Sequence, residues 1–162
     1  MIEKVAMTTI SFESRYISVC DVASKDDFRF RCSINIVPGV YFVTVSRNTF
    51  TGKICSISMR HHDAKSLGTL KHIALVGSLS GRVGFFSRKP NYKADELERI
   101  DRACARTKAS DDDVERFYRK CSPKSSEKCV GIYTWCNSKE TYYPVCIRKM
   151  PDGNIGYIEI NF

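Results

Sequence analysis

Short stretches of β-branched and aromatic residues, separated by turn signals, constrain the fold of this chain more than any other feature. Apolar and polar residues alternate within these stretches, which is the pattern of strands packed on one side. The pattern predicts a first strand over 28–36, followed by a turn at Pro38-Gly39. It then predicts an antiparallel hairpin of 40–46 with 53–60, closed by a turn at 49–52.

The rest of the chain continues in the same style. A glycine-bounded loop, Gly77-Ser78-Leu79-Ser80-Gly81, separates two short candidate strands, and Pro151-Asp152-Gly153-Asn154 is a strong hairpin turn signal. No internal repeat is evident. The further predicted strands cover 71–76, 82–87, 129–136, 142–149 and 155–162.

Two helices are predicted between the central and the C-terminal strands. In 94–106, Leu97 and Ile100 recur at helical spacing, and acidic residues occupy the first turn, where the helix dipole favours anions. A second helix is expected from Ser110 to Cys121, because Ser110 begins a pattern that resembles a capping box. We therefore expect an α+β fold, β-rich, with a mostly antiparallel curved sheet or open barrel and two covering helices.

Length and composition favour one packed unit. With 162 residues and 43% hydrophobic residues, we expect a single domain over 1–162. Two lobes remain an alternative, a β-rich basic lobe over 1–92 and a lobe of helices and strands over 93–162. The longest apolar runs fall far short of the ~20 residues of a membrane span. The amino terminus lacks a secretory signal pattern, so a cytoplasmic location is expected.

Eight cysteines are scattered along the chain. A chain of this size folds without disulfides, so we expect reduced thiols that are mostly buried as small apolar groups. No Cys-x-x-Cys pair is present, and the spacing of the last four does not fit a zinc ribbon or finger, so no structural metal is predicted. The cysteines are Cys20, Cys32, Cys55, Cys104, Cys121, Cys129, Cys136 and Cys146.

The net charge of +8 is confined to residues 47–93, because basic and acidic groups cancel in the segments on either side. The segment 47–93 contains nine basic residues and a single acidic residue, Asp63. If these side chains share a face, their potential attracts a polyanion, and the release of counterions from phosphates supplies affinity. The candidate nucleic-acid-binding residues are Arg47, Lys53, Arg60, Lys65, Lys71, Arg82, Arg88, Lys89 and Lys93, with His61, His62 and His72 as auxiliary contacts.

No catalytic constellation can be assembled from the motifs. The loop 77–81 has Leu79 where a nucleophile elbow has its nucleophile, and no Gly-Lys-Ser/Thr follows as in a P-loop. Its backbone amides could still contact a phosphate beside Arg82. His61-His62-Asp63 is interpreted as a basic loop rather than a metal site, because adjacent residues rarely point the same way. We therefore expect neither an enzyme nor a cofactor.

Four stretches resemble landmarks of an uncharacterised bacterial and phage protein family. Its members show a Gly-x-Tyr-x-Val strand, a Ser-Gly-x-x-Gly-Phe-Phe turn and a closing Asp-Gly hairpin. The family usually has Asp where this chain has Leu79, which favours binding over acid-dependent catalysis. In length and basicity the chain also resembles the MotB type of T-even phage early proteins, a resemblance that implies a DNA-binding modifier of transcription. The stretches are 38–43, 54–60, 80–86 and 143–162.

Charge and resemblance together predict a protein that binds double-stranded DNA without sequence specificity, mainly through phosphates. The expected role is that of a phage early protein that modulates transcription or the host nucleoid. No recognition-helix, zinc-finger or RNA-recognition signature is present to read bases. The alternative is an interaction module that inhibits or redirects a host protein through the same basic surface. An enzyme acting on nucleotides or nucleic acid would need an acid or metal site that the sequence does not supply.

Overall fold

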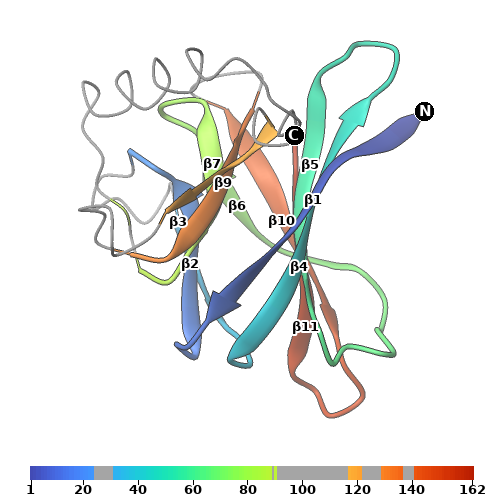
Figure 1. Ribbon diagram of the computed structural model, residues 1–162, viewed down its shortest axis with the longest axis vertical. Coiled ribbons are helices and arrows are strands. Elements are labelled where there is room, and N and C mark those ends of the chain that lie inside the picture. Colours follow the sequence, from blue (N-terminus) through green and yellow to red (C-terminus); the bar gives the residue numbers. More distant parts are fainter. Residues whose placement is uncertain (24–30, 89, 91–116, 122–128, 137–140) are drawn as a thin grey trace.

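Two antiparallel sheets make up the part of the chain that the structure describes, as Figure 1 shows. The structure is a computed structural model. It describes residues 1–23, 31–88, 90, 117–121, 129–136 and 141–162. Eleven strands lie in these segments, and all of their pairings are antiparallel.

The larger sheet has six strands and carries the residues of interest for function. Long strands from the N-terminal half form one side of it, and the C-terminal hairpin lies between them and β6. In order across the sheet, the strands are β1 (Ile2–Phe12), β4 (Gly39–Asn48), β5 (Ile54–His61), β11 (Ile155–Asn161), β10 (Tyr142–Lys149) and β6 (Lys71–Gly77).

The smaller sheet has five strands and packs against the larger one. Both sheets combine strands from the two halves of the chain. In order, the strands are β3 (Arg31–Asn35), β2 (Tyr16–Asp21), β7 (Arg82–Phe86), β9 (Gly131–Trp135) and β8 (Arg119–Cys121).

The core lies between the inner faces of the two sheets. Met59 and Ile158 from the larger sheet join Val19 and Val83 from the smaller sheet in one fully buried apolar cluster. Burial of a side chain of this size contributes about 1.5–3 kcal/mol. Because side chains alternate along a strand, burying these residues turns their neighbours toward the outer face of the larger sheet. That outer face is therefore where a surface site can form.

Most of the strands expected from the sequence are present. The hairpin of 40–46 with 53–60 is β4 with β5, and the C-terminal hairpin is β10 with β11. The strands expected over 28–36, 71–76, 82–87 and 129–136 correspond to β3, β6, β7 and β9, although β3 is described only from Arg31. Strands β1 and β2 were not predicted.

The expected fold class is wrong in two respects. The strands form two separate sheets rather than one curved sheet or open barrel, and the described residues contain no α-helix. The helix expected over 94–106 lies outside the described residues. The second expected helix ends in strand β8, where Arg119 pairs with Tyr133 of β9. Pairing with β9 thus overrides the local helical spacing that ends at Cys121.

Candidate nucleic-acid interface

The basic residues of 47–93 do not converge on one surface. Arg47 and Lys53 belong to the turn between β4 and β5, which we call the hairpin tip (residues 47–53). Arg60 lies at the other end of β5, roughly 20 Å away at about 3.3 Å per residue. It belongs to what we call the loop end: the last residues of β5 and β10, the loop 62–70 and the first residues of β6. Figure 1 shows the tip and the loop end at opposite extremes of the larger sheet.

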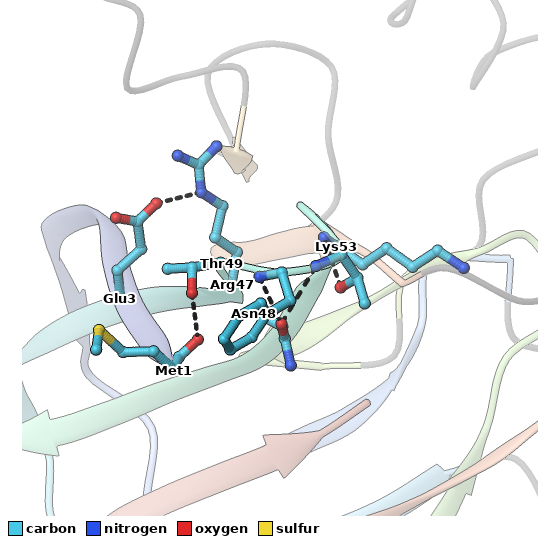
Figure 2. A network of polar contacts seen from close by, with 8 residues as sticks. Met1, Glu3, Arg47, Asn48, Thr49 and Lys53 are labelled. Atoms are coloured by element: carbon cyan, nitrogen blue, oxygen red, sulfur yellow. Dashed lines mark hydrogen bonds and ion pairs between the residues drawn. The ribbon is translucent and has the colours of Figure 1, made fainter.

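At the hairpin tip, Arg47 is held by the N-terminal strand. Its Nε donates to the carboxylate of Glu3, as Figure 2 shows. The backbone N–H and the hydroxyl of Thr49 both donate to the carbonyl oxygen of Met1, at 2.9 and 3.0 Å. Since Glu3 already balances the guanidinium of Arg47, this residue is a weak candidate for contact with a phosphate.

The turn itself is closed by its own side chains. The Oδ1 atom of Asn48 accepts hydrogen bonds from the N–H groups of Phe50 and Thr51, at 2.9 and 3.3 Å. The N–H of Lys53 donates to the Thr51 hydroxyl at 3.3 Å (Figure 2). The Lys53 side chain is exposed, so the hairpin tip offers one solvated cation on a rigid turn.

At the loop end, two arginines are held in place by one loop. The Nε and Nη2 atoms of Arg60 donate to the carbonyl oxygen of Ala64, and Nε of Arg148 donates to that of Gly68 at 2.7 Å. The loop is tied to β10 in turn, because the N–H of Gly68 donates to the Lys149 carbonyl at 2.8 Å. Within the described residues, Nη1 of Arg60 and both terminal nitrogens of Arg148 have no acceptor, so both side chains present donors to solvent.

These two arginines belong to one row of side chains on the outer face. Phe42 pairs with Arg60, Arg60 with Tyr157, and Tyr157 with Arg148, across strands β4, β5, β11 and β10. Side chains of directly paired residues lie on the same face of a sheet. Phe42 is 48% exposed, although its strand neighbours Tyr41 and Val43 are buried. The row therefore alternates aromatic and cationic side chains.

Tyr157, at the centre of the row, is fixed at its hydroxyl. Its O–H donates to Oε1 of Glu159 at 3.2 Å, and it also hydrogen-bonds to the Ser58 side chain. Burial raises the pKa of Tyr157, with Glu159 adding to the shift, so the phenol stays neutral at physiological pH. The guanidinium carbon of Arg148 lies over the ring, 6.0 Å from its centroid. Ring and guanidinium thus form one ordered group.

His61 is part of the fold rather than of the surface. Its ring is 3% exposed and packs edge-on against Tyr41, with 5.0 Å between ring centroids. Nδ1 accepts a hydrogen bond from the N–H of Asp63 at 3.1 Å, so Nε2 carries the proton and donates to the Pro38 carbonyl at 3.2 Å. Both ring nitrogens are used, and we remove His61 from the expected contacts.

His62 and His72 are exposed and stay possible contacts. Nδ1 of His62 lies 3.1 Å from the Val40 carbonyl oxygen, and its Nε2 lies 3.3 Å from Oδ1 of Asp63. His61, His62 and Asp63 each place one ligand atom within 4.8 Å of the others. However, His61 has no lone pair to give, and two ligands are fewer than the three or four protein ligands of zinc sites. This cluster does not form a metal centre.

The remaining expected residues divide between the loop end and the smaller sheet. Lys65 and Lys71 are exposed at the loop end, together with Lys149. Arg82 begins β7 of the smaller sheet and donates from Nη1 to the Ser80 carbonyl at 3.1 Å, while Arg88 is exposed just after β7. Lys89 and Lys93 lie outside the described residues.

The glycine-bounded loop 77–81 cannot serve as a phosphate cradle. The carboxylate of Asp21, fully buried, accepts hydrogen bonds from the backbone N–H groups of Leu79 and Ser80 at 2.9 and 2.8 Å. The Ser80 hydroxyl donates to the same carboxylate at 2.7 Å. An internal anion therefore occupies the donors that an external phosphate would need, and the loop serves to connect β6 with β7.

The excess positive charge resides entirely in the described residues. They hold fourteen Lys and Arg side chains against six Asp and Glu, and one of the six is the buried Asp21. The seven cysteines in this part are thiols rather than disulfides, and five of them are buried, as expected. Among the described residues, no helix is long and apolar enough to span a membrane.

No protein family, curated protein or solved structure matches this chain. The resemblance to bacterial and phage proteins therefore stays a prediction.

Sequence reasoning missed three residues of the row: Phe42, Tyr157 and Arg148. Arg148 was overlooked because charges were summed by segment, and the segment 94–162 is neutral as a whole. The signal that could have found it is the C-terminal hairpin, which was predicted correctly. Pairing that hairpin residue by residue places Arg148 directly opposite Tyr157.

Proposed function

We propose that the protein binds DNA without sequence specificity, through backbone phosphates contacted at the loop end of the larger sheet. The observation that carries this proposal is the pair of Arg60 and Arg148, whose side chains are anchored to the loop 62–70. In the part of the chain that the structure describes, Nη1 of Arg60 and both terminal nitrogens of Arg148 have no acceptor. Lys65, Lys71 and Lys149 are exposed at the same end of the sheet and add to its positive potential at longer range, although Lys71 pairs with the buried Ile147 and so lies on the face opposite the row.

Anchored guanidinium groups suit phosphate in two ways. A guanidinium donates several hydrogen bonds in a fixed plane, and charge-assisted bonds to phosphate oxygens are roughly twice as strong as neutral ones. Because the carbonyls of Ala64 and Gly68 already hold the two Nε atoms, less side-chain entropy is lost when a phosphate binds. Preorganisation thus turns surface charges into a binding site.

Contacts of this kind carry no base sequence. Phosphates look alike along every sequence, so the arginine pair positions DNA without reading it. The described residues contain no helix that could enter a major groove. We therefore expect similar affinities for unrelated sequences.

The same proposal includes a location and a role. A cytoplasmic location agrees with the thiol state of the described cysteines, since reducing compartments disfavour disulfides. A role in modulating transcription or the nucleoid of a host cell follows from the resemblance to phage early proteins, and it requires the DNA binding proposed for the loop end.

The test is the salt dependence of binding to fluorescently labelled DNA of random sequence, measured by anisotropy. With about four phosphates neutralised, log affinity should fall with log salt at a slope of roughly −3 to −4. The double variant Arg60→Ala/Arg148→Ala should bind more weakly and lower the magnitude of the slope by roughly 1.5–2. The proposal is wrong if the protein does not bind DNA at low salt, or if the double variant leaves the slope of log affinity against log salt unchanged.

A further inference from the structure

We infer that the DNA strand bound at the loop end is single, with an unpaired base stacked on Phe42 and the following phosphates of the strand on Arg60 and Arg148. This inference rests on the proposed function and specifies its ligand. The duplex expected from the sequence would use only the charges of this surface. The row of Phe42, Arg60, Tyr157 and Arg148 offers more than charge.

The first argument is the exposed ring of Phe42. It is 48% exposed on the outer face, in register with Arg60 on the neighbouring strand. Bases in a duplex are stacked on one another, so an exposed phenyl ring gains nothing from them. Unpaired bases stack on aromatic side chains, whatever the sequence, because every base has a π face.

The second argument is the width of the row. From Phe42 on β4 to Arg148 on β10 there are three strand-to-strand intervals of about 4.8 Å, or roughly 14 Å in all. The major groove of B-DNA is about 12 Å wide and admits a helix or a two-stranded ribbon. A four-stranded face cannot enter it, so a duplex would be contacted only at its phosphates and its bases would not reach Phe42. A single strand has no groove to fit and can lie across the strands.

The third argument is the order of the side chains. Along a single strand, bases and phosphates alternate, and the row alternates rings and guanidinium groups in the same manner. Arg148 lies over the Tyr157 ring, and Tyr157 is held by Glu159, so this half of the row is fixed before DNA arrives. Glu159 disfavours a phosphate beside it, which leaves the phosphates to the arginines on either side of β11.

The experiment compares a short thymidine oligonucleotide with a duplex of equal length, for the wild type and for Phe42→Ala. Loss of one stacking contact should weaken oligonucleotide binding about tenfold and leave duplex binding within about twofold. The matched control is Phe50→Ala, which removes an 87% exposed ring at the hairpin tip and should change neither affinity.

Stacking can be measured directly with the variant Phe42→Trp. The fluorescence of its indole should be quenched when the oligonucleotide binds. Phe50→Trp should not be quenched. If duplex and oligonucleotide bind equally well and Phe42→Ala behaves like Phe50→Ala, the inference is wrong while DNA binding stands. If neither ligand binds, the proposed function itself fails, so the two failures are distinguishable.

Discussion

The hairpin tip and the loop end lie at opposite ends of the same strand, β5, and both carry cations beside an exposed phenylalanine. At the tip, Glu3 balances Arg47, and Asn48 satisfies the turn amides. At the loop end, backbone carbonyls hold Arg60 and Arg148 without neutralising them. A carboxylate partner cancels the charge of a guanidinium, whereas a carbonyl partner only orients it.

This difference shows why charge summed along a sequence is a poor guide to a binding surface. Arg47 was the first of the expected contacts and is paired with a residue far away in sequence. Arg148 comes from a segment without net charge and presents two unsatisfied nitrogens within the described structure. What matters is the partner of each cation, and only the fold determines it.

Charge reversal should separate the two ends most strongly. Arg148→Glu removes two charge-assisted contacts and adds repulsion, so DNA affinity should fall about a hundredfold. Lys53→Glu, the matched change at the hairpin tip, should lower affinity less than about threefold through long-range repulsion alone. Anisotropy titrations of both variants at one salt concentration make the comparison. Equal losses would mean that the field of the whole molecule, and not the loop end, binds DNA.

Alanine in place of glycine should cost more stability at Gly39, next to His61, than at Gly52 in the hairpin tip. Gly39 has φ +143°, and a Cβ there would lie 2.7 Å from Nε2 of the buried His61, so Gly39→Ala should cost about 2–3 kcal/mol. Gly52 at the tip has φ +69° with open space around it, so Gly52→Ala should cost about 1 kcal/mol. Urea unfolding measures both values. Equal losses in the free energy of unfolding would show that the residues around His61 can shift to accommodate a Cβ at position 39.

High pH should lower the free energy of unfolding through the buried phenol of Tyr41. Burial raises the pKa of Tyr41, which packs on His61, from 10.0 to about 12. Between these values the unfolded chain loses the phenol proton while the folded chain keeps it. The contribution of Tyr41 to the free energy of unfolding should therefore be constant below pH 10 and fall by up to about 2 kcal/mol toward pH 12.

The matched variant is Tyr41→Phe, which should lose about 1 kcal/mol at neutral pH because its hydrogen bond to the Val37 carbonyl is gone. It should then decline less steeply above pH 10, since only other groups, such as the thiol of Cys32 with its pKa raised by burial to about 11, still titrate. Identical slopes for both proteins would contradict the assignment to Tyr41.

The smallest effect is expected when Arg47 at the hairpin tip loses its carboxylate partner, Glu3. Glu3→Gln leaves Arg47 without its carboxylate, so affinity for DNA should rise about twofold, while stability changes by less than about 1 kcal/mol. The gain should disappear at high salt. A loss of affinity would mean that Glu3 orients Arg47 toward the ligand instead of cancelling its charge.

The predicted strands were found in two ways: β4 and β11 alternate between buried and more exposed positions, whereas β7 and β9 are buried along nearly their whole length and were found from their composition and the turn signals around them. In β1 the pairing with β4 shifts between Lys4 and Ala6, which breaks the period of two. In β2 the alternation stops after Val19, because Cys20 and Asp21 are buried as well. The error at β8 arose because three residues are too few to display any period.

The site was harder to predict than the fold, because it depends on contacts between distant segments. The sequence correctly placed Arg60 at the end of a strand. The contact of Arg60 with the Ala64 carbonyl is local, but the sequence could not indicate that Gly68 would hold Arg148, or that Asp21 would occupy the amides of the loop 77–81. The contacts of Arg148 and Asp21 arise from pairing between strands that are far apart along the chain, which local sequence patterns do not reveal.

The position of the C-terminal hairpin also dictates how the molecule can assemble during synthesis. Among the described strands of the larger sheet, β6 pairs only with β10, and β5 joins β10 through β11. The larger sheet therefore stays in two pieces until β10 and β11 have been synthesised, and its assembly depends on contacts of high sequence separation. We expect slow folding. Until the C-terminal hairpin pairs with β5 and β6, the unpaired edges of these strands stay exposed and can be bound by chaperones.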